Sequence, residues 1–193
     1  MKIGIYGGTF DPIHDGHIYV ANRAIESEQL SKVIFVPNNQ SPLKIEKALF
    51  TNEERLNKIS EKLVNDRNKY LDTVQIFNTK PSYTIDLIHY YSNKLNYNDE
   101  LFYIMGSDAL LEFDQYFEWQ EILKYIKLIV IKRPGFEPCG FLTKYPEYGN
   151  RISTVGNPYT QHKGYEISST EIREKIKKEE ENEKRNIENN KVD

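Results

Sequence analysis

The sequence predicts an α/β fold built on a doubly wound parallel sheet, formed by a single domain. Three observations support this prediction. Short β-rich runs alternate with longer amphipathic stretches, the rhythm of strands joined by covering helices. The length of 193 residues suits one globular domain. Glycine-rich or polar segments directly follow several predicted strands, where sheets of this kind bind their ligands.

The first half of the chain is predicted to contain three strands and three helices. The strands are Lys2–Tyr6, Val33–Val36 and Val74–Phe77, and the helices are Ile18–Glu28, Thr51–Val64 and Tyr83–Leu95. The helix at 51–64 has the clearest signal. Its apolar residues recur at helical spacing, and Thr51 with Glu54 forms the pattern of a capping box at its start.

The second half continues the alternation and then becomes less regular. Strands are predicted at Leu101–Met105 and Lys127–Lys132, and short helices at Ala109–Phe113 and Trp119–Leu123. Phe136–Gly164 is rich in Gly, Pro and Tyr and is expected to be a loop with one strand at Arg151–Val155. A last helix is expected after Ser169. We place the domain at residues 1–178 and expect residues 179–193 to form a charged, flexible tail.

Composition excludes several classes of protein. The net charge of −3 disfavours nucleic acid as a partner, because domains that bind it through bulk electrostatics carry a basic surface. The single cysteine, Cys139, permits no intrachain disulfide and no metal site of paired thiolates. No segment approaches the roughly 20 apolar residues of a membrane span. We therefore expect a cytoplasmic protein without a membrane partner.

The segment Gly7–His17 carries the strongest chemical signal. Glycines directly after a strand let the backbone N–H groups approach a phosphate. His14 and His17 stand three positions apart at the start of the next helix, where the helix dipole favours anions. The alternatives are a structural turn and half of a zinc site, but a third ligand is absent from the neighbouring sequence. We expect no metal ligand here and interpret the histidines as donors to a phosphate.

With its full pattern from Gly8 to His17, this segment resembles the signature of the HxGH nucleotidylyltransferase superfamily, whose members transfer AMP or CMP from a nucleoside triphosphate. A second segment, Ile167–Arg173, is similar to the ISSTxIR motif of the mononucleotide adenylyltransferases. From the residues alone, Ser168 or Ser169 would cap a helix, and Arg173 would supply a bidentate fork. The resemblance implies a Rossmann-like nucleotidyltransferase fold, with His14 and His17 as catalytic residues.

Three middle segments resemble the branch that acts on pyridine mononucleotides: Pro37–Lys44, Pro81–Asp86 and Ile104–Asp108. The resemblance, which runs from Lys2 to Arg173, implies two sets of site residues. The ATP-binding set is Gly7, Gly8, Thr9, Phe10, His14, His17, Gly106, Asp108, Ser168, Ser169, Thr170 and Arg173. The mononucleotide-binding set is Lys44, Ser82, Tyr83, Thr84, Tyr116 and Arg133. Arg55 also matches the family, in a role that is either functional or structural.

Two positions depart from the family pattern. Tyr116 stands where a Trp commonly stacks on the pyridine ring, and Trp119, three residues later, is expected to pack in the core instead. Leu43, in the segment Pro37–Lys44, stands where a second His is common in the family. The tyrosine retains a face for stacking on the pyridine ring. It does not decide between the pyridine carboxylate and its amide, and that choice is left to the loop at 81–86.

The resemblance implies transfer of AMP from ATP to nicotinate mononucleotide, with Mg²⁺ entering on the ATP phosphates and pyrophosphate leaving. The amides of the loop at 81–86 suit a carboxylate and favour nicotinate over nicotinamide. A nicotinamide-specific or dual-specificity enzyme is the first alternative. Pantetheine-phosphate adenylyltransferases are disfavoured by His14 and Arg173, and cytidylyltransferases by the loop at 81–86. A homo-oligomer is compatible with the sequence but not indicated by it.

Overall fold

The structure, a computed structural model, describes residues 1–40, 47–133, 135–156 and 168–189. Its centre is a parallel sheet of six strands in the order β3-β2-β1-β4-β5-β6. The strands are β1 Lys2–Gly8, β2 Lys32–Pro37, β3 Lys69–Leu71, β4 Glu100–Gly106, β5 Lys127–Ile131 and β6 Ile152–Val155. The order reverses between β1 and β4, which confirms the predicted doubly wound sheet.

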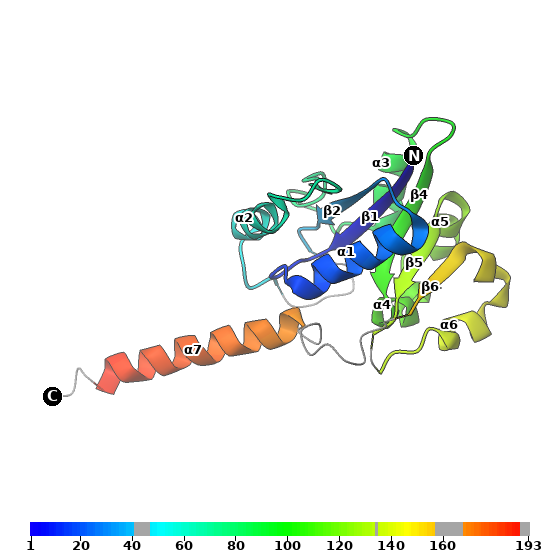
Figure 1. Ribbon diagram of the computed structural model, residues 1–193. Coiled ribbons are helices and arrows are strands. Elements are labelled where there is room, and N and C mark those ends of the chain that lie inside the picture. Colours follow the sequence, from blue (N-terminus) through cyan, green and yellow to red (C-terminus); the bar gives the residue numbers. More distant parts are fainter. Residues whose placement is uncertain (41–46, 134, 157–167, 190–193) are drawn as a thin grey trace.

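Helices cover both faces of this sheet (Figure 1). They are α1 Asp15–Glu28, α2 Asn52–Leu63, α3 Thr84–Ser92, α4 Ser107–Leu111, α5 Trp119–Tyr125, α6 Cys139–Lys144 and α7 Ser169–Asn189, with 3₁₀ turns η1 Phe113–Gln115 and η2 Pro146–Arg151. Buried side chains of α1 and α2 form one core cluster, and those of α3, α4, α5 and α6 form the other. The sheet therefore lies between two apolar layers.

The strands alternate their side chains between these layers, as the pleat requires. Ile3 and Ile5 enter the cluster under α3, while Tyr6 enters the cluster under α1 and α2. Gly4 faces the α1 side, where an added Cβ would lie 2.7 Å from Leu30 Cδ1 and 2.8 Å from Ile104 Cδ1. That close approach lets the segment after α1 and the neighbouring strands pack tightly against the middle of β1.

The predicted third strand is misplaced. Strand β3 is Lys69–Leu71, which pairs with β2, whereas Val74–Phe77 forms turns. The reason is local: the Asp72 carboxylate accepts a hydrogen bond from the Val74 N–H at 3.0 Å, which turns the chain directly after β3. Ile76 is nevertheless fully buried, so its apolar character reflects a turn that is packed against the core.

The region 136–164 contains more regular structure than the sequence predicted. Helix α6 and the turn η2 precede β6, and the side chain that defines α6 is Phe141, which is buried in the cluster under α4 and α5. Strand β6, Ile152–Val155, confirms the strand predicted within this region. The glycine and proline content led to the prediction of a loop, and the short helix α6 within it was not predicted.

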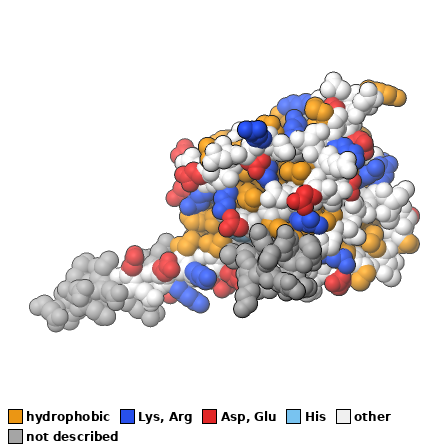
Figure 2. Space-filling view, in the orientation of Figure 1, with side chains coloured by type: hydrophobic (Ala, Val, Ile, Leu, Met, Phe, Trp, Pro, Cys, Tyr) orange, Lys and Arg blue, Asp and Glu red, His pale blue; other side chains and the backbone are white. Residues whose placement is uncertain are grey.

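Helix α7 projects away from the sheet (Figure 1) and extends to Asn189, past the boundary drawn at residue 178. The surface of α7 carries exposed side chains of both charges (Figure 2). Glu174, Lys175 and Lys178 are among them. The flexibility of residues 179–193 stays a prediction. Within the described ranges, no helix combines the length and the apolar character needed to cross a bilayer.

Candidate active site

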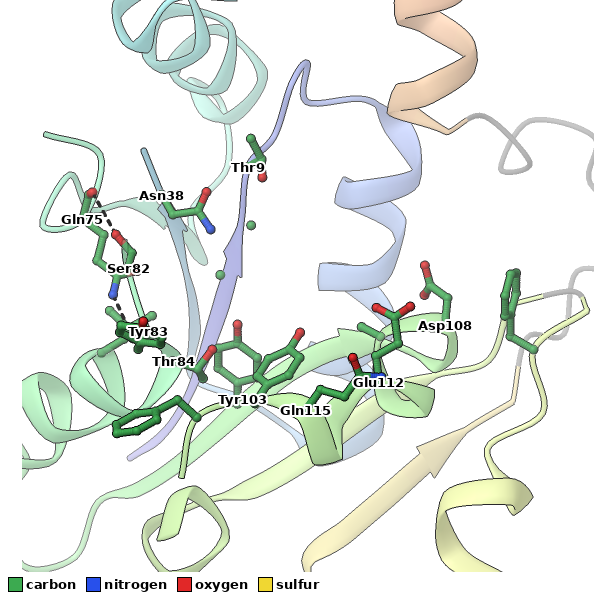
Figure 3. Close-up of a pocket in the computed structure, with 17 residues that line it drawn as sticks. Thr9, Asn38, Gln75, Ser82, Tyr83, Thr84, Tyr103, Asp108, Glu112 and Gln115 are labelled. Carbon is green, nitrogen blue, oxygen red and sulfur yellow. Dashed lines mark hydrogen bonds between the residues drawn. The ribbon is translucent and has the colours of Figure 1, made fainter. Parts of the chain in front are cut away.

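Two adjoining cavities lie at the carboxyl ends of β1 and β4, where the strand order reverses. The larger has a volume of about 550 Å³ and the smaller about 190 Å³. Their linings share Gly7, Gly8, Thr9, Tyr103, Asp108, Ala109 and Tyr116. Together they form one cleft at the position where open α/β sheets bind ligands (Figure 3).

The histidine pair begins helix α1, with His14 at the N-cap and His17 in the first turn. The His14 backbone N–H donates to His17 Nδ1 at 3.2 Å, which places the proton of a neutral His17 ring on Nε2. The ring centroids lie 3.8 Å apart. His17 lines the smaller cavity. Burial, aided by Arg133, lowers the pKa of His14 to about 4, so this ring is neutral at pH 7.

Arg55 of α2 binds the loop between β1 and α1, and it is 0 % exposed. Its Nη1 donates to the carbonyl oxygens of Thr9 at 2.6 Å and Asn38 at 2.8 Å. Its Nη2 donates to Asn52 Oδ1 at 2.6 Å. Arg55 thus joins the loop after β1 to the loop after β2, which decides for the structural role among the two that the sequence allowed.

The start of α7 closes the other side of the same loop. Ser168 caps the helix, since its Oγ accepts from the Glu171 N–H at 3.2 Å. Ser169 Oγ donates to the Pro12 carbonyl at 3.1 Å, and Arg173 Nη1 donates to the Asp11 carbonyl at 2.9 Å. Ser169 and Arg173 line the smaller cavity beside His17. The two motifs at opposite ends of the chain therefore form one site.

Asp11 is a buried member of this loop that sequence reasoning passed over. Its carboxylate accepts from the backbone N–H groups of Leu49 at 2.8 Å and Phe50 at 2.9 Å. The carboxylate also lies 3.7 Å from the Arg173 guanidinium. Asp11 stood inside the motif between Gly8 and His17, so its position was visible, but its hydrogen-bond partners 38 residues away were not.

Asp108 and Arg133 form an ion pair at 2.7 Å above Gly106. Arg133 is further held by its backbone N–H, which donates to the buried Ser107 Oγ at 2.9 Å. We predicted Asp108 on the ATP side and Arg133 on the mononucleotide side. The structure places both in the lining of the smaller cavity, together with His17. Asp108 lines the larger cavity as well, so the ion pair lies next to both cavities, and the substrate that each residue serves stays a prediction.

The larger cavity gathers the residues predicted for the mononucleotide. Ser82, Tyr83, Thr84 and Tyr116 all line it, and Figure 3 shows the first three at the start of α3. The Tyr116 ring packs at 5.1 Å from the Phe113 ring, and burial raises the pKa of Tyr116. The sixth predicted residue, Lys44, lies outside the described residues.

Several lining residues of the larger cavity were missed by sequence reasoning: Asn38, Gln75, Tyr103, Glu112, Gln115, Phe117 and Phe136. Phe117 is 58 % exposed, and its ring lies 5.2 Å from that of Tyr83. A second aromatic residue directly after Tyr116 was the available signal in the sequence. As expected, Trp119 packs away from the cavity, against Phe141, Tyr145 and Tyr148.

The switch point of this parallel sheet carries a glycine loop, a histidine pair and a capped helix. These features are those of an α/β enzyme that binds nucleotides. The profile of the cytidylyltransferase-like proteins matches residues 5–175. The chain belongs to this family and, within it, to the nicotinate-nucleotide adenylyltransferases, which confirms the resemblance stated from the motifs.

Relatives of this branch match most of the chain. A probable nicotinate-nucleotide adenylyltransferase of Shewanella woodyi is 33% identical, over 91% of this chain and 88% of its own. The nicotinate-nucleotide adenylyltransferase of Bacillus subtilis is 32% identical, over 91% and 86%. The solved structure of Plasmodium falciparum nicotinic acid mononucleotide adenylyltransferase, complexed with NaAD, superposes with a TM-score of 0.73 at 22% identity, covering 90% of this chain and 82% of that one. That last match supports the fold.

Proposed function

We propose that this chain transfers the adenylyl group of ATP to nicotinate mononucleotide, giving nicotinate adenine dinucleotide and pyrophosphate. The observation that carries the proposal is the divided cleft, in which two cavities share the wall formed by Gly7, Gly8 and Thr9. A reaction that joins two nucleotides needs two adjoining subsites with the reacting phosphates at their boundary. The names of the relatives support the choice of substrates.

In the reaction, an oxygen of the mononucleotide 5′-phosphate attacks the α-phosphorus of ATP in line. The new P–O bond forms as the bond to the β-phosphate oxygen breaks, and the electron pair leaves with pyrophosphate. His17 Nε2–H, aimed by the hydrogen bond at its Nδ1, stabilises charge on the α-phosphate. His14 acts beside it as a neutral ring, and Lys44 and Arg173 are assigned to phosphate charge.

The charge of the triphosphate also requires a cation, and we assign Mg²⁺ to the ATP phosphates. Among the described residues, no group of three or more His, Cys, Asp or Glu side chains is placed to hold a metal ion. Bound to the ATP phosphates, Mg²⁺ would neutralise charge on the departing pyrophosphate.

For the pyridine ring, the start of α3 supports the acid. Tyr83 occupies the N-cap position of α3, and the first N–H groups of a helix favour a negative charge. Tyr83 and Phe117 provide exposed rings beside it. A carboxylate gains from both the dipole and the N–H donors, whereas an amide gains from the donors alone. We assign the reaction to the cytoplasm and leave an assembly of identical chains to be tested by light scattering.

The test is pyrophosphate release by the purified protein with ATP and Mg²⁺, with nicotinate and nicotinamide mononucleotides in parallel. We expect release with the acid to be at least tenfold faster. Equal rates would replace the proposal by a dual-specificity enzyme. Release with neither mononucleotide, but with 4′-phosphopantetheine, would refute the assignment of the larger cavity.

A further inference from the structure

Tyr103 is a buried side chain in the cleft to which the motifs assign no task. It lies on β4, paired with Ile5 of β1, and is 6 % exposed. It lines both cavities. A Cβ added to Gly7 would lie 2.6 Å from the Tyr103 hydroxyl oxygen, so the phenol fills the space that the glycine leaves open at the end of β1.

The Tyr103 hydroxyl is also tied to the mononucleotide side of the cleft. Figure 3 shows the Thr84 side chain beside the Tyr103 ring. Burial raises the pKa of Tyr103, an effect that the neighbouring Thr84 side chain partly offsets. The phenol is therefore protonated at neutral pH. A protonated phenol at this position can donate its O–H into the cleft.

We infer that Tyr103 is a further binding residue for the mononucleotide, donating its hydroxyl proton to a ribose or phosphate oxygen at the boundary of the two subsites. This inference rests on the proposed function. The boundary is formed by Gly7, Gly8 and Thr9, and the Tyr103 hydroxyl lies directly beside the first of them. Oxygen acceptors are the polar groups that a ribose 5′-phosphate presents there. A neutral donor suits this position, because the positive charge of the site is supplied by Arg133 and Arg173.

ATP also carries ribose and phosphate oxygens, so the two substrates must be separated by the geometry. Thr84 lines the larger cavity, and it begins α3, whose first turn forms the predicted mononucleotide loop. Because Tyr103 lies beside Thr84, its hydroxyl is on the mononucleotide side of the cleft. The inference therefore commits to the mononucleotide.

The test is Tyr103→Phe, which removes one oxygen and keeps the ring in the core. Tyr91→Phe is the matched control: Tyr91 is also 6 % exposed, and its hydroxyl donates to Asp72 at 2.6 Å, outside the cleft. We expect Tyr103→Phe to raise KM for nicotinate mononucleotide about 3- to 10-fold, the value of one net hydrogen bond. The KM for ATP and kcat should stay within twofold, and Tyr91→Phe should leave both KM values unchanged.

Calorimetric titration with nicotinate mononucleotide alone, and with a non-hydrolysable ATP analogue alone, separates binding from turnover. A weaker mononucleotide titration with an unchanged analogue titration supports the inference. Equal weakening of both, or of neither, overturns it. Thr84→Val serves as a second variant, and its effect should not simply add to that of Tyr103→Phe, because the two side chains are neighbours in the same wall of the cleft. If the wild-type protein releases no pyrophosphate with this substrate, the proposed function fails first.

Discussion

Arg55 offers the sharpest test of how the site is held together. Arg55→Met keeps the length of the apolar stem but removes every donor, leaving the buried carbonyl oxygens of Thr9 and Asn38 without the bonds at 2.6 and 2.8 Å. Each buried acceptor left unpaired costs about 1–3 kcal/mol. For the two together we expect the free energy of unfolding to fall by about 3–4 kcal/mol.

Thermal unfolding followed by circular dichroism measures this loss. For a chain of this size, 1 kcal/mol corresponds to about 2–4 °C in Tm, so the variant should melt about 6–16 °C below the wild type. Arg23→Met on α1 is the control, at a side chain that is 24% exposed and lies outside the cleft. Arg23 pairs at 2.6 Å with the largely exposed Glu26, and a pair of that kind is worth about 1 kcal/mol or less. A Tm decrease for Arg55→Met no larger than that of Arg23→Met would refute the proposed role of Arg55.

Three further predictions concern His17, Gly106 and His14. His17→Ala should lower kcat about 100- to 1000-fold in a folded protein, and turnover within threefold of wild type would contradict its role. A Cβ at Gly106 would overlap Asp108 Oδ1 and lie 2.9 Å from Arg133 Cδ, so Gly106→Ala should displace that ion pair and raise KM for ATP about tenfold; an unchanged KM would separate the pair from ATP binding. The pKa of His14 is lowered from 6.5 to about 4, so the unfolded chain takes up the proton first, and stability should decrease as the pH falls from 6.5 to 4. Since the ring is partly exposed, we expect a loss of about 1–2 kcal/mol. Urea titrations at several pH values would give the free energy of unfolding, which should decrease more steeply with falling pH in the wild type than in His14→Gln.

The central strands gave the clearest signal in the sequence, because they are buried on both faces. At β5, the run Leu128–Ile131 is apolar without interruption and fully buried, so length and composition were sufficient. The edge strand β3 gave no such signal, because Tyr70 is half exposed and only three residues pair with β2. The apolar residues that attracted the prediction, Val74–Phe77, are packed by a turn rather than by a sheet.

The site was predictable where a motif is contiguous and incomplete where the contacts are not local. His17, Ser169 and Arg173 lie together as the two motifs implied. Tyr103 was missed because a tyrosine inside an apolar strand is typical of a core residue, and its role depends on Thr84 and on the absence of a side chain at Gly7. The substrate that Arg133 serves stays a prediction. Its pairing with Asp108 beside the smaller cavity could not be foreseen, because that contact joins residues 25 positions apart.

The segment Thr9–Pro12 explains why the two motifs occur together in one chain. Three of its backbone carbonyl oxygens are bound by side chains from distant segments: Thr9 by Arg55, Asp11 by Arg173 and Pro12 by Ser169. A loop whose carbonyls are held on the outside keeps its N–H groups available to the cleft, as phosphate binding requires. Arg173 therefore has two tasks, since the guanidinium assigned to phosphate also holds the loop that presents His14 and His17. Loss of ATP affinity in an Arg173 variant then measures the loop and the charge together, and a lysine at this position would retain the charge while losing the planar fork that serves both.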